Sequence, residues 1–336
     1  MARLVKLTYY FRKPRYRVFS IERVYQTVSE HLPKDIQTQD FICAHTSSGI
    51  LNRLRDAWAA RKSQADVNHV TGDIHYLTYF LSRKRTILTF HDFGSVTHAH
   101  GLRKWLLWLF WVYLPVKKSA ELITISEATR KELLKLVKVD PNHIHVIHNP
   151  LTLAAVEKRT PFNAKRPQIL QIGTKSNKNF YRHVEALREI PCEMVIVGQL
   201  DDQQKQTLST KNIQFTHHEN VSDAKIQEIY EDADILLFSS LVEGFGLPIL
   251  EAQAAGVPVI TSNLLSMPEV AGDGALLVNP ENVDEIRRSV EKIINDADLR
   301  ANLVAKGKKN ISRFDPQIVA EKYATLYRKV LQSAID

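Results

Sequence analysis

Residues 235–260 read ILLFSSLVEGFGLPILEAQAAGVPVI, a pattern from which the type of fold can be predicted. The apolar runs at 235–238 and 257–260 are short and continuous, which predicts two buried strands. Between them, a turn with two glycines leads into an apolar segment at 249–255 that is expected to be helical. The stretch therefore predicts a βαβ unit in a buried parallel sheet.

The same alternation of short apolar runs and helical segments extends over both halves of the chain. Residues 154–167 read AAVEKRTPFNAKRP, a polar stretch with two prolines that is typical of a linker. Other helices are expected at Tyr181–Glu189 and Ala224–Glu231. The expected strands are Leu4–Tyr9, Phe41–Ala44, Asp66–Val70, Thr86–Phe90, Leu122–Ile125 and His145–Ile147 in the first half, and Ile169–Ile172, Met194–Val197, Ile213–Phe215, Ile235–Phe238, Val257–Ile260 and Ala275–Val278 in the second.

This rhythm predicts an α/β protein with two similar domains, residues 1–155 and residues 165–315. The length of 336 residues is enough for two ordinary domains. In open parallel sheets, ligands bind beyond the carboxyl ends of the strands. Two such domains that face each other would form a cleft between those ends.

The charge of the chain is unevenly distributed. Residues 1–160 carry 25 lysines and arginines against 13 aspartates and glutamates, a net of +12, whereas residues 161–336 have a net of −4. The basic half suggests contact with an anionic partner, such as an acidic membrane surface, a phosphorylated acceptor or nucleic acid. A lysine-rich surface that only aids solubility is the alternative. No helix-turn-helix, zinc-finger or aromatic RNA-binding motif is found, so we expect no nucleic-acid partner.

The sequence favours a cytoplasmic location. The N-terminal stretch MARLVKLTYYFRK lacks the apolar region of a signal peptide. The longest apolar run, Trp105–Val116, is too short to span a bilayer. Cys43 and Cys192 lie far apart in apolar surroundings, which predicts two buried thiols in a reducing compartment.

The turn after the 235–238 run has the chemistry of a ligand site. Glu243 follows the carboxyl end of the predicted strand, where ligands bind. Gly244 and Gly246 allow a ligand to approach the backbone closely, and Pro248 suits the first turn of a helix. The N–H groups at that helix start favour an anion such as phosphate. Glu251 lies about one turn inside the helix, and its carboxylate can accept two hydrogen bonds from adjacent hydroxyls of a ribose.

The pattern Glu-Gly-Phe-Gly-Leu-Pro-x-x-Glu at 243–251, continued by Ala-x-Ala-x-Gly-x-Pro-Val, resembles the nucleotide-sugar motif of retaining glycosyltransferases of family 4. These enzymes have the GT-B fold, with two Rossmann-like domains facing across a cleft. The resemblance extends along most of the chain. The other matching segments are Thr-Phe-His-Asp at 89–92, Ile-Ser-Glu-Ala-Thr-Arg-Lys-Glu-Leu at 125–133, Val-Ile-His-Asn-Pro at 146–150, Gly-Thr-Lys-Ser-Asn-Lys-Asn at 173–179, Ser-Met-Pro-Glu-Val at 266–270 and Arg-Phe-Asp-Pro at 313–316.

The resemblance implies roles for individual residues. Lys178 would bind the donor diphosphate, His91 would be the active-site histidine, and Glu243 would contact hydroxyls of the donor sugar. Residues 316–336 would form a closing helix that packs back on the first domain. The residues expected to bind the donor are Gly173, Thr174, Asn177, Lys178, Gly244, Phe245, Gly246, Leu247 and Glu251.

The chain departs from the family pattern in three places. Asn177 stands where many members have an arginine, and either Lys175 or Arg182 could supply the missing charge. The loop after the first expected strand has no glycine, which puts a donor contact through that loop in doubt. Val242 replaces the usual aromatic residue before the first motif glutamate.

The resemblance also implies the reaction: transfer of a hexose from a nucleoside-diphosphate sugar with retention at the anomeric carbon. A lysine, a helix N-terminus and backbone N–H groups would absorb the charge of the departing diphosphate, so neither a metal ion nor any other cofactor is expected. Asp232 and Asp234 precede an apolar run, and Asp201 and Asp202 lie in a polar stretch expected to be an exposed loop. None of them forms a convincing metal-binding motif.

The acceptor side of the site is ambiguous in the sequence. The first loop, with Arg12, Lys13, Arg15 and Arg17, could bind an anionic, lipid-linked acceptor, contact acidic lipid headgroups at the inner membrane face, or simply be solvated. The segment 103–111, RKWLLWLFW, with Trp105 and Trp108, suits a membrane interface, but a helix that is apolar all round also suits a protein core.

Cell-envelope glycan synthesis is therefore the expected context. Two alternatives remain open: a nucleotide-sugar-binding protein without transferase activity, and an epimerase or phosphorylase of similar fold. Donor hydrolysis without acceptor, or dependence on phosphate, would separate them from a transferase.

Overall fold

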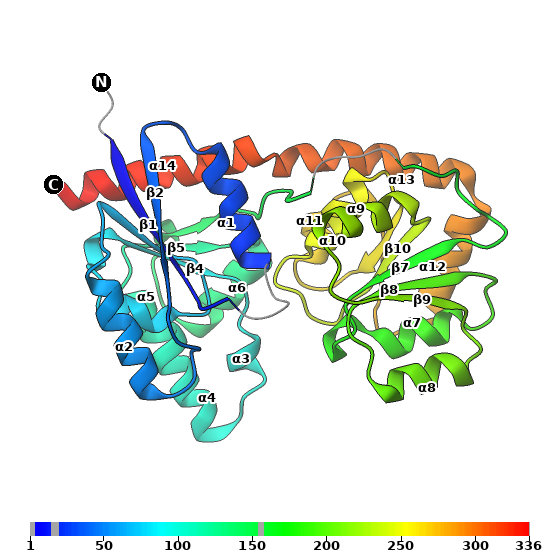
Figure 1. Cartoon of the computed structure of the whole chain (residues 1–336), viewed down its shortest axis with the longest axis horizontal. Helices are drawn as coiled ribbons and strands as arrows, with labels where there is room; N and C mark the ends of the chain where they lie inside the picture. Colours follow the sequence, from blue (N-terminus) through cyan, green and yellow to red (C-terminus); the bar gives the residue numbers. More distant parts are fainter. Residues whose placement is uncertain (1–3, 15–19, 154–157, 336) are drawn as a thin grey trace. The chain divides into compact units, whose positions relative to one another are not determined.

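The computed structural model describes residues 4–14, 20–153 and 158–335 and divides into two compact units. Unit 1 comprises Met1–Pro150 together with Asp315–Asp336, and unit 2 comprises Leu151–Phe314. Each unit is an α/β structure in which helices cover a parallel sheet (Figure 1). The chain therefore builds most of unit 1, completes unit 2, and returns to unit 1 with its last segment.

Unit 1 is built on a six-stranded parallel sheet. Its strands are β1 (Val5–Phe11), β2 (Ile36–Ile42), β3 (Val67–Val70), β4 (Thr86–Phe90), β5 (Glu121–Thr124) and β6 (Ile144–Val146). Their order in the sheet is β2-β1-β3-β4-β5-β6, so the chain changes direction between β1 and β3. Every residue of β3, β4 and β5 is buried, because helices cover both faces of a parallel sheet.

The helices of unit 1 include one long composite segment. A run from Gly101 to Lys117 is α-helical at both ends and π-helical in the middle. Pro115 has no N–H, so carbonyl groups in the preceding turn lack a backbone donor. Two side chains supply donors for these carbonyl groups: the Tyr79 hydroxyl donates to the Phe110 carbonyl, and His75 Nδ1 donates to the Trp111 carbonyl over 2.6 Å. The helices are α1 (Ser20–His31), α2 (Ile50–Arg61), η1 (His75–Tyr79), η2 (Arg83–Arg85), α3 (Gly94–Thr97), α4 (Gly101–Leu107), η3 (Trp108–Tyr113), α5 (Leu114–Lys117), α6 (Glu127–Leu136), η4 (Pro141–His143) and α14 (Pro316–Ile335).

Helix α14 is part of the core of unit 1. Tyr323 and Tyr327 are fully buried, and the Tyr327 hydroxyl lies 2.8 Å from His69 Nδ1 and 3.1 Å from the Tyr9 hydroxyl. Arg328 forms an ion pair of 2.9 Å with Asp35, whose carbonyl accepts from the Val5 N–H at the start of β1. Burial lowers the pKa of His69 to about 3, so its ring is neutral and bonds as a neutral group. These contacts attach the last 20-residue helix to the first strand of the chain.

Unit 2 is built on a second six-stranded parallel sheet. Its strands are β7 (Gln168–Ile172), β8 (Glu193–Val197), β9 (Phe215–His218), β10 (Ile235–Phe238), β11 (Val259–Ser262) and β12 (Ala275–Val278). Their order is β12-β11-β10-β7-β8-β9, so the direction of the chain reverses between the neighbours β7 and β10. The loops after these two strands therefore meet at a topological switch point, where open α/β sheets bind ligands. The helices are η5 (Ser176–Lys178), α7 (Phe180–Leu187), α8 (Asp202–Thr210), α9 (Asp223–Asp232), α10 (Leu247–Ala254), α11 (Met267–Ala271), α12 (Val283–Asn295), α13 (Ala297–Asn310) and η6 (Ile311–Phe314).

The structure confirms the predicted fold of two Rossmann-like α/β sheets. The strands expected at Thr86–Phe90, Ile235–Phe238 and Ala275–Val278 have the same bounds in the structure. Two expected strands were misplaced by several residues: β2 starts at Ile36, not Phe41, and β9 starts at Phe215 rather than ending there. Both are edge strands with mainly exposed or half-buried residues, so neither produces an apolar run.

Two smaller expectations were also corrected. Asp201 and Asp202 are exposed, as expected, but they lie at the start of α8 and not in a loop: Asp201 caps α8, and its carboxylate accepts a 2.7 Å hydrogen bond from the Gln204 N–H. Part of the expected linker is fastened to unit 2, because Lys158 Nζ lies 2.9 Å from Asp234 Oδ1. Residues 154–157 of that linker lie outside the described residues.

Candidate active site

The loop after β7 presents a lysine at the carboxyl edge of the unit 2 sheet. Gly173 ends the strand with a φ of 82°, a conformation that favours glycine. The chain then turns through η5, and the aliphatic part of Lys178 folds back over Gly173, where an added Cβ would meet Lys178 Cε at 3.1 Å. The Lys178 ammonium lies 4.6 Å from the centre of the Phe238 ring, at the end of β10. The glycine thus makes room for the lysine stem and directs its charge toward the neighbouring strand.

Lys178 and Glu243 form an ion pair across the switch point. Lys178 Nζ lies 2.6 Å from Glu243 Oε1, and the two side chains are only 18% and 14% exposed. Dissolved salt screens a partly buried ion pair less than a surface pair. Removal of either side chain would leave the other charge uncompensated. The two sequence-predicted residues are therefore brought together, one from the loop after β7 and the other from the loop after β10.

Asn177 holds these two loops in register. Its side-chain amide donates to the Val242 carbonyl over 3.0 Å, and its own carbonyl accepts from the Leu241 N–H over 2.8 Å. At the position where an arginine charge could be expected, Asn177 therefore joins the two loops by hydrogen bonds. Of the two candidates for that charge, Arg182 donates to Asn179 Oδ1 over 3.1 Å, while Lys175 is exposed.

The glycine-containing turn leads directly into α10. Gly246 caps the helix with a φ of 109°, and Pro248 occupies its first turn, as predicted. Phe245 is buried against the ring of Phe314, so its side chain anchors the turn and its backbone is the part that can face a ligand. Leu247, the first helical residue, is half-buried. The Ser266 hydroxyl donates to the carbonyl groups of Glu243 and Phe245 over 3.1 and 2.9 Å, and these contacts hold the turn in place.

Glu251 is oriented by a residue that the sequence did not single out. Tyr230 in α9 is 1% exposed, and its hydroxyl donates to Glu251 Oε2 over 2.7 Å. Such a bond to an ionised acceptor is among the stronger side-chain hydrogen bonds. Tyr230 therefore restricts the rotation of the carboxylate that the motif assigns to a ribose.

A buried polar network supports the loop after β7. The ring of His183 bonds the side chain of Gln171 at one nitrogen and the Ser239 hydroxyl at the other, the latter over 2.6 Å. Gln171 in turn donates to the carbonyl groups of Gly173 and Lys178 over 2.8 and 3.2 Å. Burial lowers the pKa of His183 to about 3, so the network contains a neutral histidine. No sequence motif pointed to it, because its members are spread over three elements.

Thr174 is held by internal hydrogen bonds. Its hydroxyl donates to the Gln199 carbonyl, and its carbonyl accepts from the Gln204 side chain over 2.7 Å. Both groups are used within the protein, so Thr174 shapes the loop through these contacts. To donate to a ligand, the Thr174 hydroxyl would have to give up its hydrogen bond to the Gln199 carbonyl.

In unit 1, His91 follows β4 at the carboxyl edge of the sheet. Its Nε2 lies 2.6 Å from the Thr71 carbonyl. Because a carbonyl can only accept, Nε2 carries the proton and Nδ1 keeps its lone pair. Burial lowers the pKa of His91, which favours this neutral form. Gly72 has a φ of 144°, and an added Cβ there would lie 2.6 Å from His91 Cδ2, so the glycine makes space for the ring.

Arg12 lies beside this histidine and is largely buried. Its guanidinium pairs with Asp73 at 2.5 Å and with Glu22 at 3.2 Å, and its side chain is 8% exposed. Burial alone would raise the pKa of Asp73, but Arg12 and the nearby histidines lower it overall. Arg12 also lines a pocket of about 390 Å³ in unit 1 with Glu22 and Tyr25. Arg12 is thus a buried ion-pairing residue, whereas Lys13 is exposed and Arg15 and Arg17 lie outside the described residues.

The aromatic helix has two faces. The Trp108 indole donates to the Leu136 carbonyl over 2.8 Å, and Trp108 and Trp111 pack on the buried core of unit 1. Trp105, in contrast, is 52% exposed, and Phe110 is 42% exposed. The structure therefore assigns Trp108 to the core, whereas the Trp105 side chain faces outward. Within the described residues, no helix is both long enough and apolar enough to cross a bilayer.

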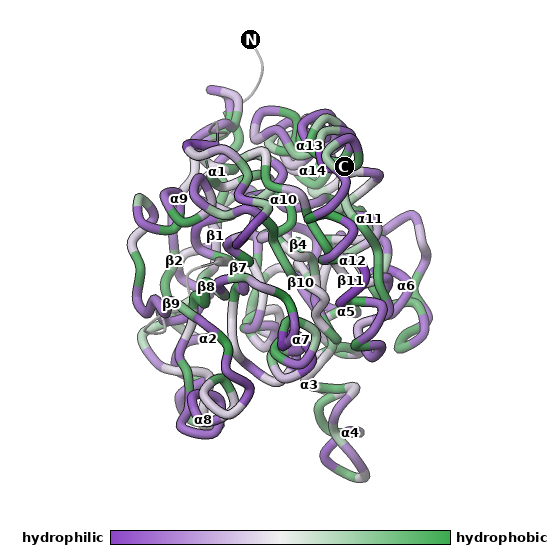
Figure 2. The backbone as a smooth tube through the Cα atoms, turned by 90° about the vertical axis from the view of Figure 1, so that its right-hand side faces the viewer, coloured by the Kyte–Doolittle hydropathy of each residue, from purple (hydrophilic) through white to green (hydrophobic). Residues whose placement is uncertain are grey.

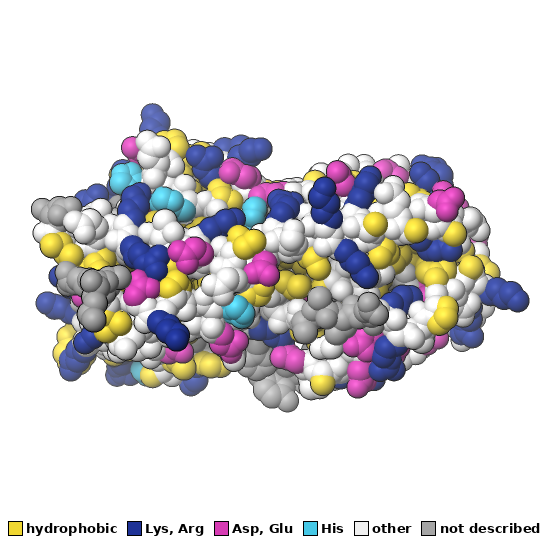
Figure 3. Space-filling view, turned by 90° about the horizontal axis from the view of Figure 1, so that it is seen from above, with side chains coloured by type: hydrophobic (Ala, Val, Ile, Leu, Met, Phe, Trp, Pro, Cys, Tyr) yellow, Lys and Arg dark blue, Asp and Glu magenta, His cyan; other side chains and the backbone are white. Residues whose placement is uncertain are grey.

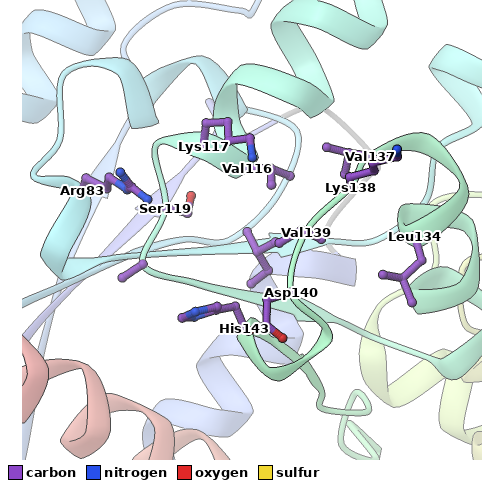
Figure 4. Close-up of a pocket in the computed structure, with 12 residues that line it drawn as sticks. Arg83, Val116, Lys117, Ser119, Leu134, Val137, Lys138, Val139, Asp140 and His143 are labelled. Atoms are coloured by element: carbon purple, nitrogen blue, oxygen red, sulfur yellow. The ribbon is translucent and has the colours of Figure 1, made fainter.

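A separate pocket of about 640 Å³ lies at the opposite edge of the unit 1 sheet (Figure 4). It is lined by Arg83, Ser119 and His143, among others, and these residues precede β4, β5 and β6. Since amino ends of parallel strands share one edge, this pocket is on the side of the sheet away from His91. In residues 4–14, 20–153 and 158–335, no group of three or more His, Cys, Asp or Glu side chains could hold a metal ion. Cys43 and Cys192 are buried free thiols, as predicted.

Comparison with known proteins places both halves of the chain among sugar transferases. The family described as glycosyltransferase family 4 matches residues 13–154, and the family described as glycosyl transferases group 1 matches residues 155–310. Over 289 residues, the chain is 27% identical to O-antigen chain mannosyltransferase B of Escherichia coli, covering 79% of this chain and 74% of that protein. It is also 25% identical over 246 residues to O-antigen chain mannosyltransferase RfbU of Salmonella typhimurium, covering 70% and 67%.

A solved structure shows the same architecture. The Anabaena protein HepE, determined in complex with UDP and glucose, superposes with a TM-score of 0.77 and 14% identity. The superposition covers 97% of this chain and all of that one. At this low identity, the superposition establishes a shared fold and does not identify a ligand.

Proposed function

Because the chain is a group 1 glycosyltransferase with the GT-B fold, we propose that it transfers a hexose from a nucleoside-diphosphate sugar with retention of anomeric configuration and without a metal ion. The acceptor is a lipid-linked or polysaccharide precursor in cell-envelope glycan synthesis. The observation that carries the proposal is the Lys178–Glu243 pair at the β7–β10 switch point, next to the start of α10.

The donor diphosphate is the ligand that this arrangement suits best. Its phosphates compete with Glu243 for the Lys178 ammonium and accept hydrogen bonds from the N–H groups at the start of α10. Glu251, oriented by Tyr230, accepts the ribose hydroxyls. Once released from Lys178, the Glu243 carboxylate is available to hydroxyls of the sugar.

The reaction breaks the bond between the anomeric carbon and a phosphate oxygen, and the electron pair leaves with the diphosphate. An acceptor hydroxyl forms the new bond on the same face, and its proton passes to the departing phosphate oxygen. Lys178 and the α10 N–H groups stabilise the negative charge that develops on that group, the task that a metal ion performs in other transferases. His91, neutral and with its Nδ1 lone pair available, is proposed to contact the donor sugar.

Mannose is the first sugar to test, because both O-antigen relatives named above are mannosyltransferases. The purified chain should be incubated with UDP- and GDP-linked hexoses, and release of the nucleoside diphosphate measured with and without an O-antigen-type lipid-linked acceptor. Acceptor-dependent release with one donor supports the proposal. A nucleotide-sugar-binding protein would show binding without release, and a phosphorylase would require inorganic phosphate.

We also propose that the enzyme works at the inner face of the membrane. The outward side of α4 carries Trp105 beside Arg103 and Lys104, and all three side chains are exposed. Aromatic and basic side chains on one helix suit the boundary between headgroups and acyl chains. An acceptor with a lipid tail would be reached most easily from that position.

A further inference from the structure

Helix α2 carries an exposed apolar stripe that no motif predicted. Its opposite side is buried through Asp56, Ala57 and Ala60. The stripe has members at position 50 and every fourth residue after it, together with Leu51, so its members lie on one side of the helix. They are Ile50, Leu51, Leu54 and Trp58, which are 74%, 70%, 46% and 57% exposed.

The α4 segment has a similar outer surface. Its first six residues are exposed, and Figure 2 shows α4 projecting beyond the rest of unit 1. The outer apolar side chains are Leu102, Trp105, Leu106 and Phe110, which are 72%, 52%, 40% and 42% exposed. We call these four residues and the four of α2 the two-helix face.

The two helices lie at the same end of unit 1 (Figure 1) and are joined by a direct contact. The Arg53 guanidinium of α2 lies 4.4 Å from the ring centre of Trp111, in the helical run that continues α4. A cation over an indole ring is a favourable contact. Trp111 is the immediate neighbour of Phe110, so this contact links the beginning of the α2 stripe to the end of the α4 stripe.

Within the two segments that carry the two-helix face, the exposed charges all have one sign. No acidic residue occurs between His98 and Lys118. Between residues 44 and 65 the single acid is Asp56, whose 2% exposed side chain accepts from His45 over 2.8 Å. The face of the molecule in Figure 3 is different, because acidic and basic side chains are interspersed there. The exposed basic residues of the two helices are Arg55, Arg61, Lys62, Arg103 and Lys104.

We propose that the two-helix face is a docking surface for a bilayer that contains anionic lipids. The proposal deepens the membrane location argued above, because it adds α2 as a second contact and names the lipid charge. A bilayer can meet both features at once: acyl chains accept the leucine, isoleucine and tryptophan side chains, and anionic headgroups accept the cations. A second copy of this chain would instead place cations against cations, and a nucleic acid would leave the apolar stripes in water.

The two stripes are expected to act together. Membrane binding strengthens with the apolar area that is buried and with the attraction to anionic lipids, and each stripe supplies only part of both. When one helix is inserted, the other is held near the surface, so its binding becomes intramolecular. Loss of either stripe should therefore weaken attachment strongly, although the other stripe is intact.

Vesicle flotation with three double variants tests this inference. Leu51→Ser with Trp58→Ser removes the α2 stripe, and Leu102→Ser with Trp105→Ser removes the α4 stripe. Phe215→Ser with Leu277→Ser is the matched control, since these exposed side chains belong to unit 2. Vesicles of phosphatidylcholine alone are compared with vesicles in which part of the lipid is phosphatidylglycerol, and circular dichroism checks that each variant is folded.

The wild type and the control should float with the anionic vesicles and remain in solution with neutral ones. Each stripe variant should bind the anionic vesicles roughly tenfold or more weakly, as expected when one of two membrane signals is lost. Wild-type binding by the α2 variant, equal binding to both kinds of vesicle, or dimerisation that the stripe variants abolish would overturn the inference. Donor turnover is measured separately: vesicle binding without any sugar transfer would refute the proposed function and leave the docking surface standing.

Discussion

Lys178 Nζ lies 2.6 Å from Glu243 Oε1, although 65 positions separate the two residues in the sequence. The strand order brings them together, because β7 and β10 are neighbours at the switch point of the unit 2 sheet. Glu243 thus holds the Lys178 ammonium at the place where a diphosphate is expected to leave. A donor phosphate then exchanges one ion pair for another, so the lysine need not be moved from water into the site.

Lys178→Ala should slow sugar transfer severely. Removal of one preorganised electrostatic stabiliser costs roughly 2–4 kcal/mol of transition-state stabilisation, which appears mainly as a fall in kcat. Steady-state kinetics with saturating donor measure it. Lys175→Ala is the matched control, because Lys175 is exposed in the same loop. The Lys175 variant should keep most of the wild-type activity. Wild-type turnover in the Lys178 variant would contradict the role given to this residue.

Glu251→Ala and Tyr230→Phe should both weaken donor binding. The alanine variant loses the carboxylate itself, whereas the phenylalanine variant loses the 2.7 Å bond that orients it. A hydrogen bond to a charged group contributes about 1.5–3 kcal/mol, so Tyr230→Phe should raise the donor Kd by less than Glu251→Ala does. Calorimetric titration with the nucleoside diphosphate and its 2′,3′-dideoxy analogue measures both effects. If the alanine variant still prefers the ribose form as strongly as the wild type, Glu251 does not bind the ribose.

The sequence predicted the central strands and the motif turn because those elements carry their own signals. The runs at 235–238 and 275–278 are apolar along their length, and Pro248 marks the start of α10. Edge strands such as β2 carry no such run, since residues 37–40 are exposed. Relations between distant residues were also invisible: the bond from Tyr230 to Glu251 and the buried contacts of Tyr327 depend on packing that no local pattern records.

Stability should fall as the pH is lowered from 7.5 to 5, because each unit buries a neutral histidine. Burial lowers the pKa of His69 in unit 1 and of His183 in unit 2 to about 3, while both have ordinary values near 6.5 when unfolded. Between those values the unfolded chain binds more protons, so protonation favours unfolding as pH falls. The loss at pH 5 is about 2 kcal/mol per histidine.

Urea unfolding at the two pH values measures this effect. His183→Gln should show a smaller difference between pH 7.5 and pH 5 than the wild type, whatever its stability at pH 7.5. An unchanged pH dependence in that variant would show that His183 titrates normally in the folded protein.

Gly72→Ala should impair activity by displacing His91. The new Cβ would lie 2.6 Å from His91 Cδ2, closer than van der Waals contact allows. Gly49→Ala is the control: Gly49 also has a positive φ, 80°, but an added Cβ there meets nothing within 4 Å. Both variants should lose about 1–2 kcal/mol of stability from backbone strain, and only Gly72→Ala should lose turnover. Equal turnover in the two variants would mean that the position of His91 does not affect the reaction.

The anomeric configuration of the product formed in the presence of EDTA tests the proposed metal-independent, retaining reaction. The one-bond carbon–hydrogen coupling at the anomeric carbon of the new glycoside, measured by nuclear magnetic resonance, reports that configuration. We predict a product with the same configuration as the donor sugar, formed at an unchanged rate after chelation, because Lys178 and the start of α10 stabilise the leaving-group charge. An inverted product, or activity that disappears with EDTA and returns only with a divalent ion, would contradict it.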